Sequence, residues 1–191
     1  MQKVTLDEIV GLERYEKIRD DFRCRIIELK KYRRVSVGDR ITFVFENHDT
    51  VLFQIQEMLR TERITHIDKI RFEVDTYNEL APNDRELSTT MLIEITEQAR
   101  IRPELVRLLG IEKAVSLQVG DSFTIPGVFE AGRSTEDNLS AVQYVRFPFS
   151  SEAQIAFQDE HNDMRLVINH PHYQAQTRLS PEVRRSLAAD L

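Results

Sequence analysis

The chain has 191 residues, of which 41% are hydrophobic and 30% are charged, and its formal net charge at pH 7 is -6. This length and balance are typical of globular proteins, so we expect residues 1–191 to form a single domain. No stretch approaches the roughly 18 uncharged apolar residues of a membrane-spanning helix, and acidic residues lie where a signal peptide would be apolar. The composition therefore predicts a cytoplasmic protein with no membrane partner.

Cys24 is the single cysteine of the chain. It excludes an internal disulfide and any thiolate-rich zinc or iron–sulfur site built by one chain. Asp20, Asp21 and Glu28 lie three or four residues away on the same predicted helix and would repel a thiolate, which argues against a catalytic or redox cysteine. The sequence also lacks a Gly-rich phosphate loop and a nucleophile-elbow motif, so we expect no cofactor.

The N-terminal half is predicted to be mainly helical. Thr5 and Glu8 have the spacing of a capping box, which begins a helix. Apolar residues at three- and four-residue steps then predict a longer helix over residues 12–32. Residues 14–34 hold nine Lys/Arg against four Asp/Glu, and the run KKYRR at 30–34 could touch phosphates. Because a helix dipole favours cations at this end and the protein is acidic, we expect ion pairs there and no nucleic acid partner.

Residues 41–45 form a short β-branched and aromatic run that predicts a buried strand. Asn47 or Asp49 would then begin a helix that extends to about residue 62. Thr65 and Asp68 repeat this start signal, and Pro82 would end the helix that they open.

From residue 87 onward the hydrophobic period changes from helical to alternating. Strands are predicted over residues 91–95, 115–119, 123–128, 141–149 and 164–169, with a tight turn at Gly120 and Asp121. Short helices are predicted over residues 103–109 and 152–157, and Ser180 followed by Pro181 predicts the start of a last helix. The expected fold class is α+β, with a helical N-terminal half packed on a mostly antiparallel sheet contributed mainly by the C-terminal half.

The predicted helix after residue 47 carries an aromatic side chain on its polar side. At 100° per residue, Phe53 lies nearly opposite the apolar face and close to Glu57 and Arg60. Another element of the same fold could cover Phe53, as is usual for large aromatic residues. Alternatively, Phe53 with Gln54, Glu57 and Arg60 would form an aromatic anchor with a polar rim, a composition favoured at protein interfaces.

Several histidines and carboxylates are candidate ligands for a metal ion. Glu62 and His66 are four residues apart, but a new helix start between them would separate them. His170 and His172 could share a strand face and join His161, but the intervening proline favours a turn. None of these groups has a recognised ligand spacing, so we expect no metal site.

The stretch RVSVGDRITFVFENHDTVLFQIQEMLRTERI, followed by DTYNEL and LSTTMLIEI, resembles a bacterial family known as domain of unknown function 3501. The likeness extends over essentially the whole chain. It implies a genomic setting beside rubrerythrin and an iron–sulfur oxidoreductase, and hence a role near peroxide defence or electron transfer. His48 departs from the family pattern, which usually reads FENRDT.

The sequence therefore favours a non-catalytic accessory protein that binds a protein partner, such as a redox protein, or a second copy of itself through the Phe53 face. The alternative is an enzyme that binds a small molecule or a metal in a pocket between the two central helices, near Glu46, Gln54, Glu57 and Tyr77.

Overall fold

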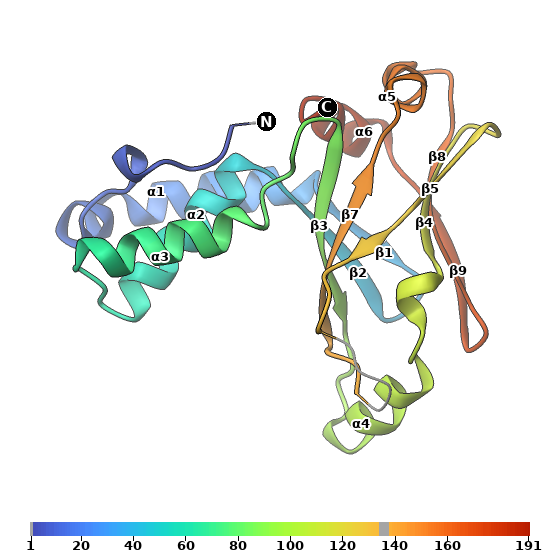
Figure 1. Ribbon diagram of the computed structural model, residues 1–191, viewed down its shortest axis with the longest axis horizontal. Helices are drawn as coiled ribbons and strands as arrows, with labels where there is room; N and C mark the ends of the chain where they lie inside the picture. The colour runs from blue at the N-terminus through green and yellow to red at the C-terminus, as the bar shows by residue number, and fades with distance from the viewer. Residues whose placement is uncertain (1, 134–137) are drawn as a thin grey trace.

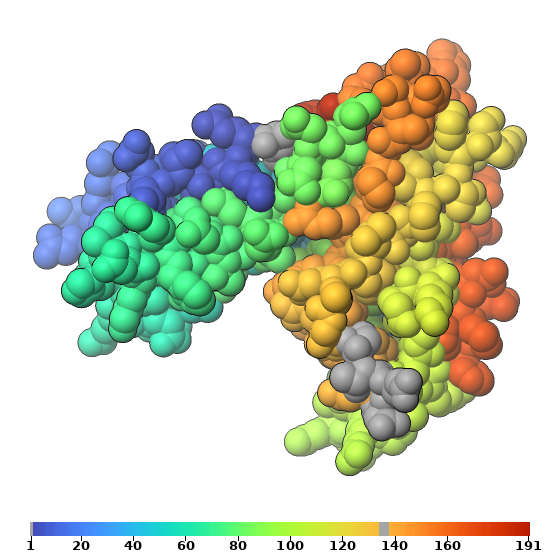
Figure 2. Space-filling model, viewed as in Figure 1, coloured from blue at the N-terminus to red at the C-terminus, as the bar shows by residue number. Residues whose placement is uncertain are grey.

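In the computed structural model, which describes residues 2–133 and 138–191, a group of long helices projects as an arm from a body of β-strands (Figure 1). The arm consists of the 3-10 turn η1 (Leu6–Glu8) and the helices α1 (Leu12–Lys31), α2 (His48–Thr61) and α3 (Ile67–Asn78). Helix α2 lies in the middle and contacts both α1 and α3. Figure 2 shows the arm standing out to one side of the body.

Within the described residues, the strands of the body form two antiparallel sheets. One sheet has the order β1-β2-β3-β7-β6. Its strands are β1 (Arg34–Val37), β2 (Ile41–Glu46), β3 (Glu86–Ile93), β7 (Val142–Pro148) and β6 (Val128–Phe129). The other sheet has the order β5-β4-β8-β9. Its strands are β5 (Phe123–Pro126), β4 (Val115–Val119), β8 (Met164–His170) and β9 (Tyr173–Arg178).

The two sheets share one apolar core. In β4 and β8 every second residue is buried, as expected for strands with one face inside. Side chains such as Phe43 and Phe147 of one sheet belong to the same buried cluster as Leu117 and Leu166 of the other. Short helices cover the ends of the body, namely α4 (Gln98–Arg107), η2 (Ile111–Lys113), α5 (Ser151–Gln158) and α6 (Pro181–Ala188).

A buried arginine joins the base of the arm to the body. Arg33 follows α1, and its side chain is only 1% exposed. Its Nε donates to the carbonyl of Phe45 at 2.9 Å, and its Nη1 donates to the carbonyl of Ser186 in α6 at 3.1 Å. Its Nη2 donates to the carbonyl of Glu46 and forms an ion pair with Asp190, whose side chain is 4% exposed. This cluster ties the arm, β2 and the C-terminal helix together.

The predicted α+β class is confirmed, with helices dominating the N-terminal half and strands the C-terminal half. Ser180 caps α6 and Pro181 occupies its first position, as predicted. Strands β1 and β9 were not predicted, and residues 123–128 divide into β5 and the start of β6. The prediction that Pro103 starts a helix was wrong. Helix α4 begins at Gln98 and continues through Pro103, although proline cannot donate the hydrogen bond of that position.

None of the helices in the described part of the chain combines the length and the apolar character that crossing a bilayer requires.

Candidate functional site

A groove follows one side of α2, between α1 and α3, and we call it the arm groove. It has a volume of about 320 Å³. Lys30 of α1 and Tyr77 of α3 lie at its walls, and the rest of its lining comes from α2 and the residue that follows it. Its lining residues are Lys30, Phe53, Gln54, Glu57, Met58, Thr61, Glu62 and Tyr77. The sequence-predicted residues Phe53, Gln54, Glu57 and Tyr77 therefore share one surface feature.

Phe53 reaches the groove because α2 turns its other side to the core. Val51, Ile55 and Leu59 are buried on that side. Phe53 packs edge-on against Phe22 of α1, with ring centroids 5.5 Å apart and an interplanar angle of 74°. Helix α1 thus covers one side of Phe53, and the half-buried remainder lines the groove.

Glu57 is held on the α1 side of the groove by a bidentate ion pair. Arg19 donates to its carboxylate through Nε and Nη2, both at 2.8 Å, and Tyr15 donates its hydroxyl at 2.8 Å. These bonds to Arg19 and Tyr15 hold the pKa of Glu57 below its ordinary value. Burial and the neighbouring carboxylate raise the pKa of Tyr15. Glu57 is therefore a charged, fixed part of the α1–α2 contact.

Glu46 does not line the groove but lies beneath it, where it is only 3% exposed. Its carboxylate accepts hydrogen bonds from the hydroxyls of Thr50 and Thr90, at 2.6 and 2.9 Å, and from the amide of Gln54 at 3.0 Å. Arg60 also lies outside the groove lining, because its Nε donates to Glu16 of α1 at 2.7 Å. Gln54 thus connects the groove surface to a buried carboxylate.

Tyr77 forms the opposite wall and is half-buried. Burial, followed by the negative charge of Glu73, raises the pKa of its hydroxyl. Met58 and Lys30 also line the groove, although the sequence reasoning did not select them. The position of Met58 beside Gln54 could have been predicted from the sequence, because Met58 lies one helical turn beyond Gln54 on α2.

A second hollow continues from the groove at the far end of the arm, and we call it the tip hollow. It has a volume of about 520 Å³ and is lined by Glu62, Ile64, Asp68, Lys69, Phe72 and Glu73. Glu62 belongs to both linings. Phe72 is 66% exposed, which is unusual for an aromatic side chain, and Ile67 of the same helix is 55% exposed. The sequence reasoning missed Phe72, which lies off the apolar face of α3.

The basic run at the end of α1 is engaged in the fold. Arg33 is buried as described above, Arg34 forms an ion pair with Glu94 at 2.6 Å, and Lys31 forms one with Glu28 at 2.6 Å.

At the β8–β9 turn, the ring of His170 has structural partners, and the ring of His172 lies beside it with centroids 5.8 Å apart. His170 is 4% exposed, its Nε2 lies 3.0 Å from the carbonyl of Leu109, and its Nδ1 accepts the backbone N–H of His172 at 3.3 Å. Both ring nitrogens are therefore used. At the base of the arm, His48 Nε2 lies 2.8 Å from the carboxylate of Glu8.

The other candidate metal ligands are also separated or exposed. Glu62 ends α2 and His66 precedes α3, so the helix break places them on different elements. His161 contacts Asp159 at 2.9 Å on an exposed loop, and Cys24 is exposed on α1. Across residues 2–133 and 138–191, no group of three or more His, Cys, Asp or Glu side chains is arranged to hold a metal ion.

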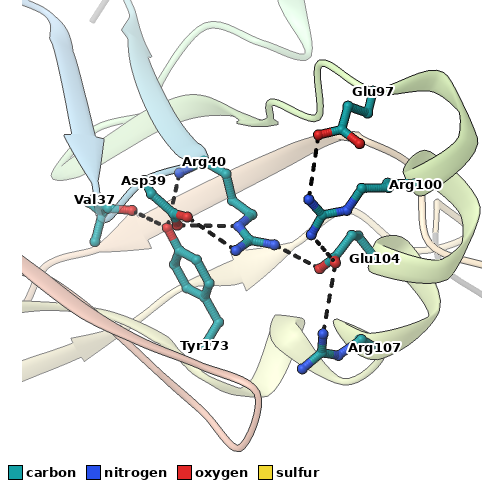
Figure 3. Close-up of polar contacts among 8 residues, drawn as sticks. All are labelled: Val37, Asp39, Arg40, Glu97, Arg100, Glu104, Arg107 and Tyr173. Atoms are coloured by element: carbon teal, nitrogen blue, oxygen red, sulfur yellow. Dashed lines mark hydrogen bonds and ion pairs between the residues drawn. The ribbon is translucent and has the colours of Figure 1, made fainter.

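A polar cluster fastens α4 to the turn between β1 and β2 (Figure 3). Glu104 accepts hydrogen bonds from Arg40 at 2.7 Å and from Arg100 at 3.0 Å, and Arg107 lies 3.8 Å away. Hydrogen bonding to Arg100 and the charge of Arg40 keep the pKa of Glu104 below its ordinary value. Since Glu104 is 8% exposed, the cluster serves to fix α4 in place.

Tyr173 closes the same cluster from β9 (Figure 3). Its hydroxyl donates to the carbonyl of Val37 at 2.7 Å and accepts the backbone N–H of Arg40 at 3.3 Å. Gly38 lies between these residues with φ +72°, and a Cβ there would come within 2.3 Å of the Tyr173 hydroxyl. The turn therefore requires glycine for its backbone conformation and for the close approach of Tyr173.

A further cavity of about 450 Å³ lies where β8 and β9 meet α5 and α6. Its lining includes Arg178 and Arg184. Arg184 donates to the carbonyls of Phe157 and Glu160 at 3.1 and 2.9 Å, and Arg178 forms an ion pair with Asp163. These guanidinium groups hold the segment that follows α5. We therefore place the candidate site at the arm groove, where side chains suited to a partner remain uncovered.

Comparison with known proteins identifies the family. A family model described as a protein of unknown function (DUF3501) matches residues 3–191. The chain belongs to this family. A similar solved structure is a crystal structure of a protein of unknown function from Burkholderia pseudomallei K96243, which is 34% identical with a TM-score of 0.93 over 100% of both chains. A search of curated proteins finds no match. The family resemblance of the sequence is thus confirmed, and the shared fold by itself assigns no activity.

Proposed function

We propose that this DUF3501 protein is a non-catalytic, cytoplasmic accessory protein that binds a protein partner along the arm groove. The observation that carries the proposal is the lining of the groove. Phe53, Met58 and Tyr77 leave apolar surface between helices, and polar side chains border them. A buried apolar centre with a polar rim is the usual anatomy of a protein interface.

The polar groups that could support chemistry favour the same proposal. Glu46 is hydrogen-bonded beneath the groove, Glu57 is neutralised by Arg19, and both nitrogens of His170 have partners. Catalytic groups usually have an open side that faces a substrate. The family resemblance suggests a redox protein as the partner class.

A small-molecule site is the second candidate, because Gln54, Glu57 and Tyr77 line one groove of about 320 Å³, within the usual range for ligand pockets. One observation argues against a small-molecule site: the pocket predicted from the sequence included Glu46, and Glu46 does not line the groove. An extended groove along a helix suits a polypeptide better than a small ligand.

A comparative pull-down from the native cell, read by mass spectrometry, tests the proposal. The variant Met58→Glu places a charge in the groove, and Ile155→Glu places the same charge on α5, where Ile155 is 69% exposed. We expect a specific partner to be lost with Met58→Glu and retained with Ile155→Glu, while circular dichroism shows both variants folded. Retention of every captured protein by Met58→Glu would contradict docking in the groove.

A further inference from the structure

We infer that the segment bound by the arm is a basic amphipathic helix, whose lysine or arginine side chains lie at the tip hollow and whose apolar side chains lie in the arm groove. This inference rests on the proposed function and names the chemistry of the partner.

The first argument is charge. Among the described residues, the linings of the arm groove and the tip hollow together hold four carboxylates and two lysines, and the tip hollow alone holds three carboxylates against one lysine, a net charge of -2. Arg19 neutralises Glu57. Within residues 2–133 and 138–191, however, no cation forms an ion pair with Glu62, Asp68 or Glu73. Unpaired carboxylates gathered in one hollow attract cationic groups and repel acidic ones.

The second argument is the kind of apolar surface present. Phe53 and Tyr77 line the groove, and Phe72 stands 66% exposed among the carboxylates of the tip hollow. The face of an aromatic ring attracts a guanidinium or ammonium group, and the nearby carboxylates add to this attraction. Arginine is also enriched at the centres of protein interfaces. The tip hollow therefore suits a long basic side chain, whose methylene groups can contact Phe72 while its charge meets the acids.

The third argument is shape. The groove extends along α2 from Phe53 to Glu62, the residue that follows the helix, which is about 14 Å at 1.5 Å per residue. A partner helix would need about two and a half turns to follow this length, with apolar side chains above Phe53 and Met58. Lys30 lies at the end of α1 next to the body, opposite in charge to Glu62 at the far end. The basic end of the partner helix should therefore point away from the body.

Two synthetic helical peptides test this inference. Both have the same leucine and alanine scaffold and one tryptophan; one carries lysines at its remaining positions and the other carries glutamates. Since the protein has no tryptophan, emission from that residue reports the peptide alone. We expect the lysine peptide to bind, with a blue-shifted emission that weakens with added salt, and the glutamate peptide not to bind.

Matched variants decide where the lysine peptide binds. Glu62→Lys should weaken its binding roughly tenfold, whereas Glu160→Lys, the same charge change on an exposed loop of the body, should leave binding within about twofold. Met58→Glu should weaken binding by blocking the apolar part of the groove.

The outcomes separate this inference from the proposed function. Equal binding of both peptides, abolished in each case by Met58→Glu, would overturn the basic helix and keep docking in the groove. If Glu62→Lys and Glu160→Lys weakened the binding of the lysine peptide equally, the binding would reflect the net charge of the protein only, and the inference would be overturned. Absence of binding by either peptide at about 1 mM would overturn it as well.

Discussion

Removal of the Asp190 carboxylate tests how the arm is attached to the body. In the variant Asp190→Ala, the guanidinium of Arg33 loses its counter-ion while it stays in a site where its side chain is 1% exposed. It keeps neutral acceptors, the carbonyls of Phe45, Glu46 and Ser186, which satisfy its hydrogen bonds but not its charge. Loss of one partner of a buried pair typically costs about 3–5 kcal/mol. Because domains of this size are stable by about 5–15 kcal/mol, we expect a large shift in the unfolding midpoint.

The Arg33–Asp190 pair as a whole should contribute less to the free energy of unfolding than the loss expected for Asp190→Ala suggests. Burial raises the pKa of Asp190, and the positive charge of Arg33 opposes that rise. In buried ion pairs of this kind, the desolvation of both ions generally offsets much of their attraction. The double variant Arg33→Met with Asp190→Leu removes both charges and keeps apolar volume. It should therefore be less destabilised than the sum of the two single variants, by about 1–3 kcal/mol.

Urea unfolding followed by circular dichroism measures these free energies. Asp163→Ala is the matched control, because Asp163 is 39% exposed and its two partners, Arg165 and Arg178, are also exposed on the surface. We expect that control to lose less than about 1 kcal/mol. If Asp190→Ala lost no more than Asp163→Ala, the reasoning that Asp190 compensates a buried charge would be refuted.

Two further predictions concern the arm and the β1–β2 turn. Arg19 holds the folded-state pKa of Glu57 below its ordinary 4.5, so this carboxylate stabilises the fold above that pH and loses its contribution as the pH falls through the folded-state pKa. Glu57→Gln should thus lower the unfolding free energy by about 1 kcal/mol near neutral pH and by progressively less as the pH falls below 4.5; a loss that did not change with pH would contradict the ion pair. Gly38→Ala should lower the free energy of unfolding by at least about 1–2 kcal/mol, because Gly38 has a positive φ and a Cβ there would clash with Tyr173. In thermal unfolding, the double variant Gly38→Ala with Tyr173→Phe should lose less than the sum of the two single variants.

Elements with local signals could be predicted from the sequence. Asn47 begins α2 because its side chain accepts the N–H of Thr50, and Ser180 begins α6 in the same way. Strand β1 gave a weaker signal, since it has only four residues and begins at Arg34, the last residue of a basic run. Pro103 was misleading because proline favours helix starts, but the helix that contains it also packs through Glu104 and Leu105.

The site needed contacts that are distant in the sequence. The outward position of Phe53 on α2 could be predicted from helical geometry, but its cover by Phe22 and the wall formed by Tyr77 depend on how three helices pack. Arg33 stood in a run that indicated exposed charge, and its burial depends on Asp190, 157 residues away. Periodicity describes faces of single elements and cannot specify which faces meet.

The projecting arm also has a mechanical consequence. Helix α2 has 14 residues, so its axis extends about 21 Å from the body. In engineering terms the arm is a cantilever that is fixed at one end, and a force at its free end produces the largest bending moment at the fixed end. That end contains Arg33, which is bonded to Ser186 in α6 as well as to β2. A load on Phe72 would therefore be borne at this end, by the Arg33 cluster and by the end of α3, where Arg146 of β7 donates to the carbonyls of Glu79 and Ala81.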